Sequence, residues 1–164
     1  MTLRFNYAEA APGVYDAMDP VDQYLDRSSL EAPLLHLVRL RASQLNGCAY
    51  CIDMHWKDLR ALGESELRLY SLDAWRESPW YTPQERAALE WTEAVTRVAE
   101  GQVPDAVFAE VEPHFSRTEL ADLTFAIAAI NAWNRLSIAA RLLPGRYRSS
   151  LQPTALEPTA PSSA

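Results

Sequence analysis

The apolar positions of this chain recur every three or four residues rather than at every second residue. One such stripe predicts a helix over residues 14–26 and consists of Val14, Met18, Val21 and Leu25. Comparable stripes predict further helices over residues 34–46, 48–62 and 65–75. No segment shows a sustained period of two. The pattern therefore predicts an all-α fold with no sheet.

A capping box marks the start of the next helix. Thr82 is suited to the N-cap, Pro83 to the first helical position, and Glu85 can return a bond to the backbone of the cap residue. We expect this helix to reach Glu100 and to stop at Gly101, because glycine readily takes the left-handed conformation after a helix.

The C-terminal helix begins with the same pattern, at Ser116 and Glu119, and we expect it to stop at Pro144-Gly145. It is apolar on nearly all sides, so it needs cover on more than one face, which favours a homo-oligomer. Three polar residues interrupt it, and we expect them to be structural hydrogen-bonding groups: Asn131, Asn134 and Arg135.

The 164 residues, 48% of them apolar, are enough for one domain with a real core. We divide the chain into an irregular extension over residues 1–13, a helical domain over 14–145 and a tail over 146–164. From residue 149 on, the tail is rich in Pro, Ser and Thr, so by itself it is expected to be mobile.

Charge and targeting signals restrict the partners. Lys and Arg total 15 against 22 Asp and Glu, which gives a net charge of −7 and argues against a nucleic-acid partner. The beginning of the chain shows no basic stretch followed by an apolar run, and the most apolar segment, residues 123–130, is too short to cross a membrane. We therefore expect a cytoplasmic protein with no membrane partner.

The candidate chemistry lies in the segment Cys48-Ala-Tyr-Cys51-Ile-Asp-Met-His55. On a helix these two thiols and the imidazole fall within about 60° of arc, so they share one face. Cys48 is at the helix start, where free N–H groups and the positive end of the dipole favour a thiolate. His55 is one turn beyond Cys51 and is placed to accept or return a thiol proton. The segment therefore predicts thiol redox chemistry.

Two other interpretations of these residues stay open. The cysteines could be buried and inert. Alternatively, Cys48, Cys51 and His55 could bind zinc, with His36 or His114 as the fourth ligand, although structural zinc ligands usually come as two pairs. Trp56 and Trp133 are candidates for the wall of a substrate pocket.

The run from Leu34 to Lys57 resembles the core of the AhpD-like alkylhydroperoxidases, within the carboxymuconolactone decarboxylase superfamily. Three later segments also resemble that group, and the resemblance covers roughly residues 14 to 143. These segments are Ala74–Ser78, Glu85–Leu89 and Ile130–Arg135.

The resemblance implies an all-helical subunit that forms a homotrimer or homohexamer. It also implies a peroxidase that uses no metal, haem or flavin. Cys51 would attack the hydroperoxide substrate, Cys48 would resolve the product into a disulfide, and His55 would pass the proton. The reductant would be a dithiol of the lipoyl or thioredoxin type. The dipole argument alone favours Cys48 as the more acidic thiol, and we follow the family for the two roles.

This sequence departs from the family pattern at one position. The family carries a glutamate twelve residues before the first cysteine, where it starts a proton relay, and His36 stands there instead. An imidazole with a pKa near about 6.5 can act as a base at neutral pH, but it brings no fixed negative charge. We therefore include His36 among the candidate catalytic residues, next to Cys51, Cys48 and His55.

Two alternative functions remain. A carboxymuconolactone-decarboxylase-type enzyme is compatible with the superfamily, although such an enzyme does not need a Cys-x-x-Cys pair. A non-enzymatic redox sensor whose disulfide changes its assembly is the other alternative, and the missing glutamate favours it.

Overall fold

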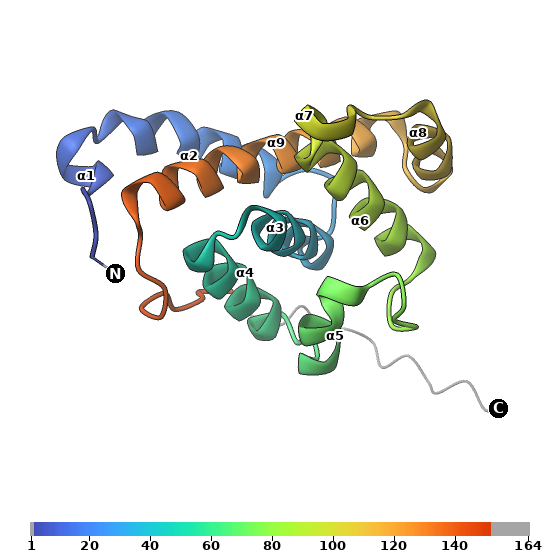
Figure 1. Ribbon diagram of the computed structural model, residues 1–164, viewed down its shortest axis with the longest axis horizontal. Helices are drawn as coiled ribbons and strands as arrows, with labels where there is room; N and C mark the ends of the chain where they lie inside the picture. The colour runs from blue at the N-terminus through green and yellow to red at the C-terminus, as the bar shows by residue number, and fades with distance from the viewer. Residues whose placement is uncertain (1, 152–164) are drawn as a thin grey trace.

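Helix α3 (Ala32–Asn46) runs through the middle of the molecule, and the other helices are arranged around it (Figure 1). The computed structural model describes residues 2–151. Within α3, the ten consecutive residues from Leu34 to Ser43 are all buried. The principal neighbours of this helix are α4 (Ala49–Ala61), α6 (Pro83–Thr96) and α9 (Arg117–Ala140).

The remaining elements are short, apart from α2, and lie around this centre. They are α1 (Tyr7–Ala10), α2 (Gly13–Leu25), α5 (Glu66–Ser71), the 3-10 turn η1 (Leu72–Ala74), α7 (Val98–Gly101), α8 (Asp105–Val111) and the 3-10 turn η2 (Glu112–His114). Residues 2–151 contain no strand, so the prediction of an all-α fold is confirmed. No helix among these residues has the length and apolarity needed to span a bilayer.

Both predicted capping boxes are present. The side chains of Thr82 and Ser116 accept the backbone N–H three residues on, and the corresponding glutamates bond back to the cap residue. Asn6 caps α1 in the same way, through the N–H of Ala8, where the sequence predicted an irregular segment. These caps satisfy backbone groups that the helix ends would otherwise leave unpaired.

Two predicted helix ends are wrong. Helix α6 ends at Thr96 rather than Glu100, because the chain turns there to bring α8 against α6. Helix α9 ends at Ala140, before Pro144-Gly145, because Arg141 takes a left-handed conformation with φ of 58°. The N–H groups of Arg141 and Leu142 then bond the last carbonyls of the helix, which closes it.

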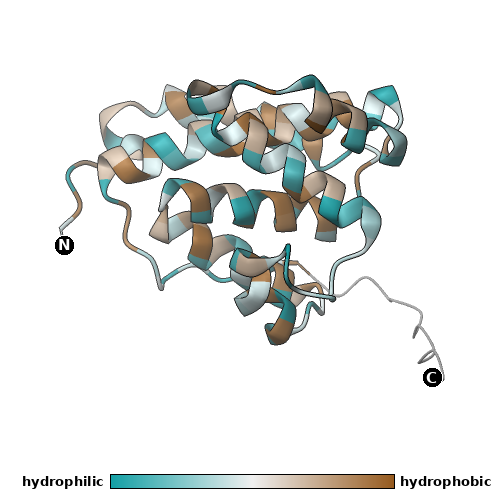
Figure 2. Ribbon diagram, turned by 45° about the vertical axis from the view of Figure 1, so that its right-hand side comes forward, coloured by the Kyte–Doolittle hydropathy of each residue, from teal (hydrophilic) through white to brown (hydrophobic). Residues whose placement is uncertain are grey.

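Hydrophobic residues are distributed along all of the longer helices (Figure 2). One apolar cluster joins α3 to α6 and α9, and a second joins α3 to α4, α5 and α6. The apolar stripe in the sequence predicts an amphipathic helix here. Because both clusters meet at α3, the helix is instead covered on all sides. Its polar side chains therefore need partners inside the protein.

Glu93 on α6 is one such partner. Its carboxylate accepts hydrogen bonds from Arg41 Nε at 2.9 Å, Trp75 Nε1 at 2.9 Å and Arg76 Nη1 at 2.8 Å. Burial raises the pKa of Glu93, but these donors outweigh it and hold the pKa below its usual value. The network ties α3 and α6 to the segment after η1.

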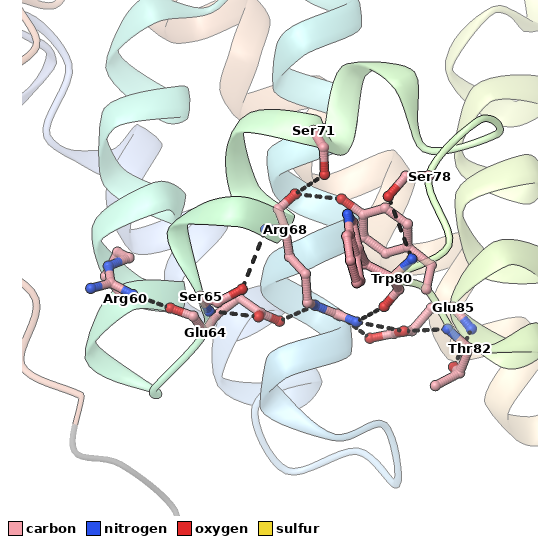
Figure 3. Close-up of polar contacts among 10 residues, drawn as sticks. Arg60, Glu64, Ser65, Arg68, Ser71, Ser78, Trp80, Thr82 and Glu85 are labelled. Atoms are coloured by element: carbon pink, nitrogen blue, oxygen red, sulfur yellow. Dashed lines mark hydrogen bonds and ion pairs between the residues drawn. The ribbon is translucent and has the colours of Figure 1, made fainter. Parts of the chain in front are cut away.

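A second polar network lies at the surface between α5 and α6 (Figure 3). Arg68 Nε lies 2.9 Å from a carboxylate oxygen of Glu64, and its Nη2 lies 2.5 Å from Glu85. Because Glu85 also closes the capping box of Thr82, the arginine connects α5 to the first turn of α6.

Asparagine side chains join α3 to α9. The Asn46 amide donates to the Oδ1 atoms of Asn131 and Asn134, both at 2.9 Å. Asn134 is fully buried and donates to Ser43 Oγ at 3.0 Å. The expected structural role of the two α9 asparagines is therefore confirmed, and their bonds hold the end of α3 in place just before Cys48.

We predict that Glu93→Gln lowers the free energy of unfolding by about 3 kcal/mol at neutral pH, because it removes the buried counter-charge of Arg41 and leaves this arginine paired with the exposed Asp73. Since the folded-state pKa of Glu93 is below its unfolded value, its contribution is present above the unfolded pKa and is lost as the pH falls through the folded pKa. The difference in the free energy of unfolding between Glu93→Gln and the wild type should therefore become smaller below about pH 4.

Urea unfolding followed by circular dichroism measures this difference. Glu90→Gln is the matched control, because Glu90 pairs with Arg76 at the partly exposed edge of the same network. This substitution should cost less than about 1 kcal/mol. If the two substitutions lower the free energy of unfolding equally, the buried network does not stabilise the protein as proposed.

Candidate active site

The two cysteines lie where α4 begins. Gly47, with φ of 69°, ends α3 in the left-handed conformation that glycine accommodates, and Cys48 follows as the N-cap of α4. Cys48 Sγ accepts the N–H of Cys51 at 3.3 Å. The two residues form a disulfide, and each is 1% exposed. The predicted Cys-x-x-Cys pair is therefore a buried, oxidised pair at a helix N-terminus.

His55 and His36 meet beside this pair. His55 lies on α4 one turn beyond Cys51, while His36 comes from α3, and their Nδ1 atoms are 3.2 Å apart. Cys51 and both imidazoles line one cavity, whereas Cys48 lines an adjacent hollow that shares Tyr50 and Ser137 with it. His114 lies in η2, is exposed and does not line this cavity.

Asp58 completes this group and was missed by the sequence analysis. Its Oδ2 atom lies 3.5 Å from His36 Nδ1 and 3.8 Å from His55 Nδ1, and the residue is 3% exposed. A signal was available, because Asp58 lies three residues beyond His55 on a helix and therefore shares its face. Position 36 carries no carboxylate, but Asp58 places one beside both imidazoles.

Tyr147 holds this carboxylate from the segment that follows α9. Its hydroxyl donates to Asp58 Oδ1 at 2.8 Å. Two more bonds fix the segment on α4: Gly145 N–H donates to Asp53 Oδ2 at 2.9 Å, and Lys57 Nζ donates to the Tyr147 carbonyl at 3.2 Å. This segment turns back along α4 in Figure 1.

No local sequence signal places Tyr147 at the site, and the sequence analysis assigned it to the tail. The tail itself was expected to be mobile. Most of it, residues 152–164, lies outside the described residues.

Burial sets the protonation of the two histidines. The pKa of His36 falls to about 3, first because of burial and then because of the nearby His55 and Arg39, with Asp58 opposing. Burial also lowers the pKa of His55. His36 is therefore neutral at pH 7 and a far weaker base than the ordinary imidazole that the sequence analysis assumed.

Asp58 stays ionised. Burial raises its pKa, but the nearby His55 and the hydroxyls of Ser149 and Tyr147 outweigh it and hold the pKa below its usual value. At neutral pH the group consists of two neutral imidazoles and one carboxylate. Nε2 of His55 is buried and has no hydrogen-bond partner among the described residues.

The cavity in front of this group has a volume of about 320 Å³. Aromatic side chains form much of its wall, and Tyr15 stacks on Trp133 with ring centroids 5.8 Å apart. Trp133 Nε1 donates to Asp22 at 2.9 Å, which fixes the indole. Trp133 thus lines the cavity as expected, whereas Trp56 packs against the leucines of the second apolar cluster.

Metal ligands among the described residues converge at one place only, at His36, His55 and Asp58. The zinc set considered from the sequence does not form here, because the disulfide leaves Cys48 and Cys51 without a free thiolate. His114 is also absent from the group.

Comparison with known proteins identifies relatives of this chain. Residues 12–94 match the model of the carboxymuconolactone decarboxylase family. The uncharacterized protein YdfG of Bacillus subtilis is 42% identical over 139 residues, which cover 85% of this chain and 95% of YdfG.

Two solved structures share the fold. A protein of unknown function from Agrobacterium tumefaciens, described as a candidate antioxidant defence protein AhpD, is 44% identical with a TM-score of 0.86, over 89% of this chain and all of that one. The debrominase Bmp8 is 19% identical with a TM-score of 0.72, over 82% of this chain and 73% of its own, which shows similarity of fold alone.

The family match covers the first half of the chain, including α3 and α4 with the cysteine pair, and the two closely similar proteins extend the likeness over most of the remainder. This chain therefore belongs to the carboxymuconolactone decarboxylase family, as an AhpD-like member.

Proposed function

We propose that this protein is a thiol-dependent peroxidase that reduces organic hydroperoxides or hydrogen peroxide through Cys48 and Cys51. One observation carries the proposal: Cys51 and His55 line the same cavity, and within residues 2–151 His55 Nε2 has no hydrogen-bond partner while the cysteines are oxidised. A disulfide sulfur has no proton to donate, but a reduced Cys51 thiol has one. His55 is thus ready to accept a proton that exists only in the reduced protein.

The cavity supports Cys51 as the attacking residue and Cys48 as the resolving one. Cys51 lines the cavity together with His55, and Cys48 does not. Cys48 is instead the N-cap, where the N–H of Cys51 meets its sulfur and favours a thiolate. A more acidic Cys48 therefore suits resolution, so the dipole argument and the family assignment no longer conflict.

The reaction balances with a dithiol as the electron source. The Cys51 thiolate attacks the distal oxygen of ROOH, the O–O bond breaks, and ROH leaves with one proton while Cys51 becomes a sulfenic acid. The Cys48 thiolate then attacks that sulfur, the S–O bond breaks, and the hydroxyl leaves as water with a second proton. An external dithiol, of the lipoyl or thioredoxin type, reduces the disulfide and is itself oxidised.

Asp58 is the positioning residue for the proton carrier. An anionic carboxylate beside His55 Nδ1 favours the tautomer with its proton on Nδ1, which leaves Nε2 as the acceptor. At 3.8 Å the carboxylate acts on His55 through its charge rather than through a hydrogen bond. His36 does not act as the base, in keeping with its low pKa. Its Nδ1 atom instead contacts His55 Nδ1 and accepts the proton that His55 carries there.

The wall of the cavity supports an organic hydroperoxide as substrate. Trp133, Tyr15 and Met54 present apolar surface, and a volume of about 320 Å³ accommodates a small alkyl or aryl group. A homotrimer or homohexamer remains part of the proposal. Phe125 and Ile138 support it, since they lie exposed on α9, at 42% and 44%.

We predict sustained peroxide consumption by the wild type with cumene hydroperoxide and excess dihydrolipoamide. Cys48→Ser and Cys51→Ser should both abolish turnover. Cys48→Ser should still consume one equivalent and carry a sulfenic acid on Cys51, because the attacking thiol is intact and only resolution is blocked. Peroxide assays and mass spectrometry after dimedone labelling measure these outcomes.

The same experiment separates the alternatives. A sulfenic acid on Cys48 in the Cys51→Ser variant would reverse the two roles. A single stoichiometric oxidation of the wild type, with no turnover when dithiol is supplied, would contradict the peroxidase and favour the redox sensor.

His55→Gln should slow the reaction of reduced Cys51 with peroxide by about 100-fold, because general base catalysis typically contributes that much or more. Stopped-flow tryptophan fluorescence, with a chelator present, gives the second-order rate constant. His114→Gln is the control, since that exposed histidine lies outside the cavity. An unchanged rate in His55→Gln would remove His55 from the mechanism.

A further inference from the structure

His36, His55 and Asp58 bring three atoms that can bind a metal to within 3.8 Å of one another. The two Nδ1 atoms are 3.2 Å apart, and Asp58 Oδ2 is 3.5 and 3.8 Å from them. Hydrogen bonds between such atoms measure about 2.7 to 3.2 Å, so the carboxylate oxygen is too far from either imidazole for a good bond. Zinc with bonds of about 2.0 to 2.1 Å places neighbouring ligands of a tetrahedron about 3.3 to 3.4 Å apart.

We propose that His36 Nδ1, His55 Nδ1 and Asp58 Oδ2 form a binding site for one divalent transition-metal ion, with its fourth position open to the cavity. Two imidazoles with one carboxylate suit zinc and other transition metals, whereas magnesium and calcium require a shell of oxygen ligands. Three protein ligands and an open position are the arrangement of a reactive rather than a structural metal site.

The surroundings hold the three ligands as metal sites require. Tyr147 donates to Asp58 Oδ1, the oxygen that faces away from the proposed metal, and thus orients the carboxylate. The two histidines come from different helices, α3 and α4, whose packing fixes their separation. All three ligand residues are buried, at 8%, 4% and 3% exposure, so water competes weakly for their lone pairs.

Metal binding and the proton relay exclude each other. A metal on His55 Nδ1 requires the imidazole to carry its proton on Nε2, and that atom then cannot accept the proton of Cys51. The site therefore exists in a metal-bound and a relay-competent form. The metal site does not depend on peroxidase activity, and its test uses neither peroxide nor dithiol.

The test is a calorimetric titration of the full chain with zinc chloride, after chelator treatment and with the disulfide intact. Because the oxidised cysteines cannot ligate, any tight site must use other residues. We expect one zinc per chain with a Kd in the micromolar range or tighter, and no binding of magnesium at the same concentrations. His36→Gln and Asp58→Asn should each weaken zinc binding by more than about 100-fold, as loss of one of three ligands requires.

Two further variants make the result specific. Tyr147→Phe should weaken binding by about 10- to 100-fold, since it removes the support of Asp58 but no ligand. His114→Gln should bind as the wild type does. Zinc should also raise the Tm of the wild type and of His114→Gln, and not that of Asp58→Asn, while circular dichroism confirms that each variant is helical.

Absence of zinc binding by the wild type would overturn the proposal. Zinc binding by His36→Gln and Asp58→Asn as tight as that of the wild type would overturn it too, because the metal would then lie elsewhere on the chain.

Discussion

The burial of α3 on all sides is the constraint on which the rest of the structure depends. A helix in that position must satisfy each of its polar side chains inside the protein, because water cannot reach them. Arg39 forms ion pairs with Asp22 of α2 at 3.5 Å and with Asp26, which follows α2, at 3.7 Å. Arg41 bonds Glu93 of α6, Ser43 accepts from Asn134 of α9, and His36 meets His55 of α4. Each of these contacts orients a different neighbouring helix. The polar residues of α3 thus determine how the bundle is assembled as well as where its chemistry lies.

The candidate active site follows from the way α3 passes into α4. Gly47 turns the chain sharply, so the first residue after it becomes the N-cap of the next helix, and that residue is Cys48. The face of α4 that carries Cys51, His55 and Asp58 then packs toward α3 and meets His36. Asp58 of α4 places a carboxylate beside both imidazoles, in the space between α3 and α4.

Local patterns in the sequence were sufficient for much of this description. The period of the apolar positions predicted the helices, and two Ser/Thr-x-x-Glu patterns predicted the capping boxes that the structure contains. The spacing of Cys48, Cys51 and His55 placed them on one helical face, because the geometry of a helix is the same in every protein. The ends of α6 and α9 were predicted less well, since those helices stop where the packing of later segments requires a turn.

The sequence by itself determined the helical class, the family and the presence of a Cys-x-x-Cys pair at a helix start, because each depends on residues close together in the chain. Only the tertiary structure decided what surrounds that pair. His36 meets His55 across two helices, and the burial produced by this packing lowers the pKa of His36 to about 3. Tyr147 reaches Asp58 from 89 residues away, along a segment with no pattern of its own. Desolvation and long-range contacts are properties of the packed molecule, and no local period in the sequence encodes them.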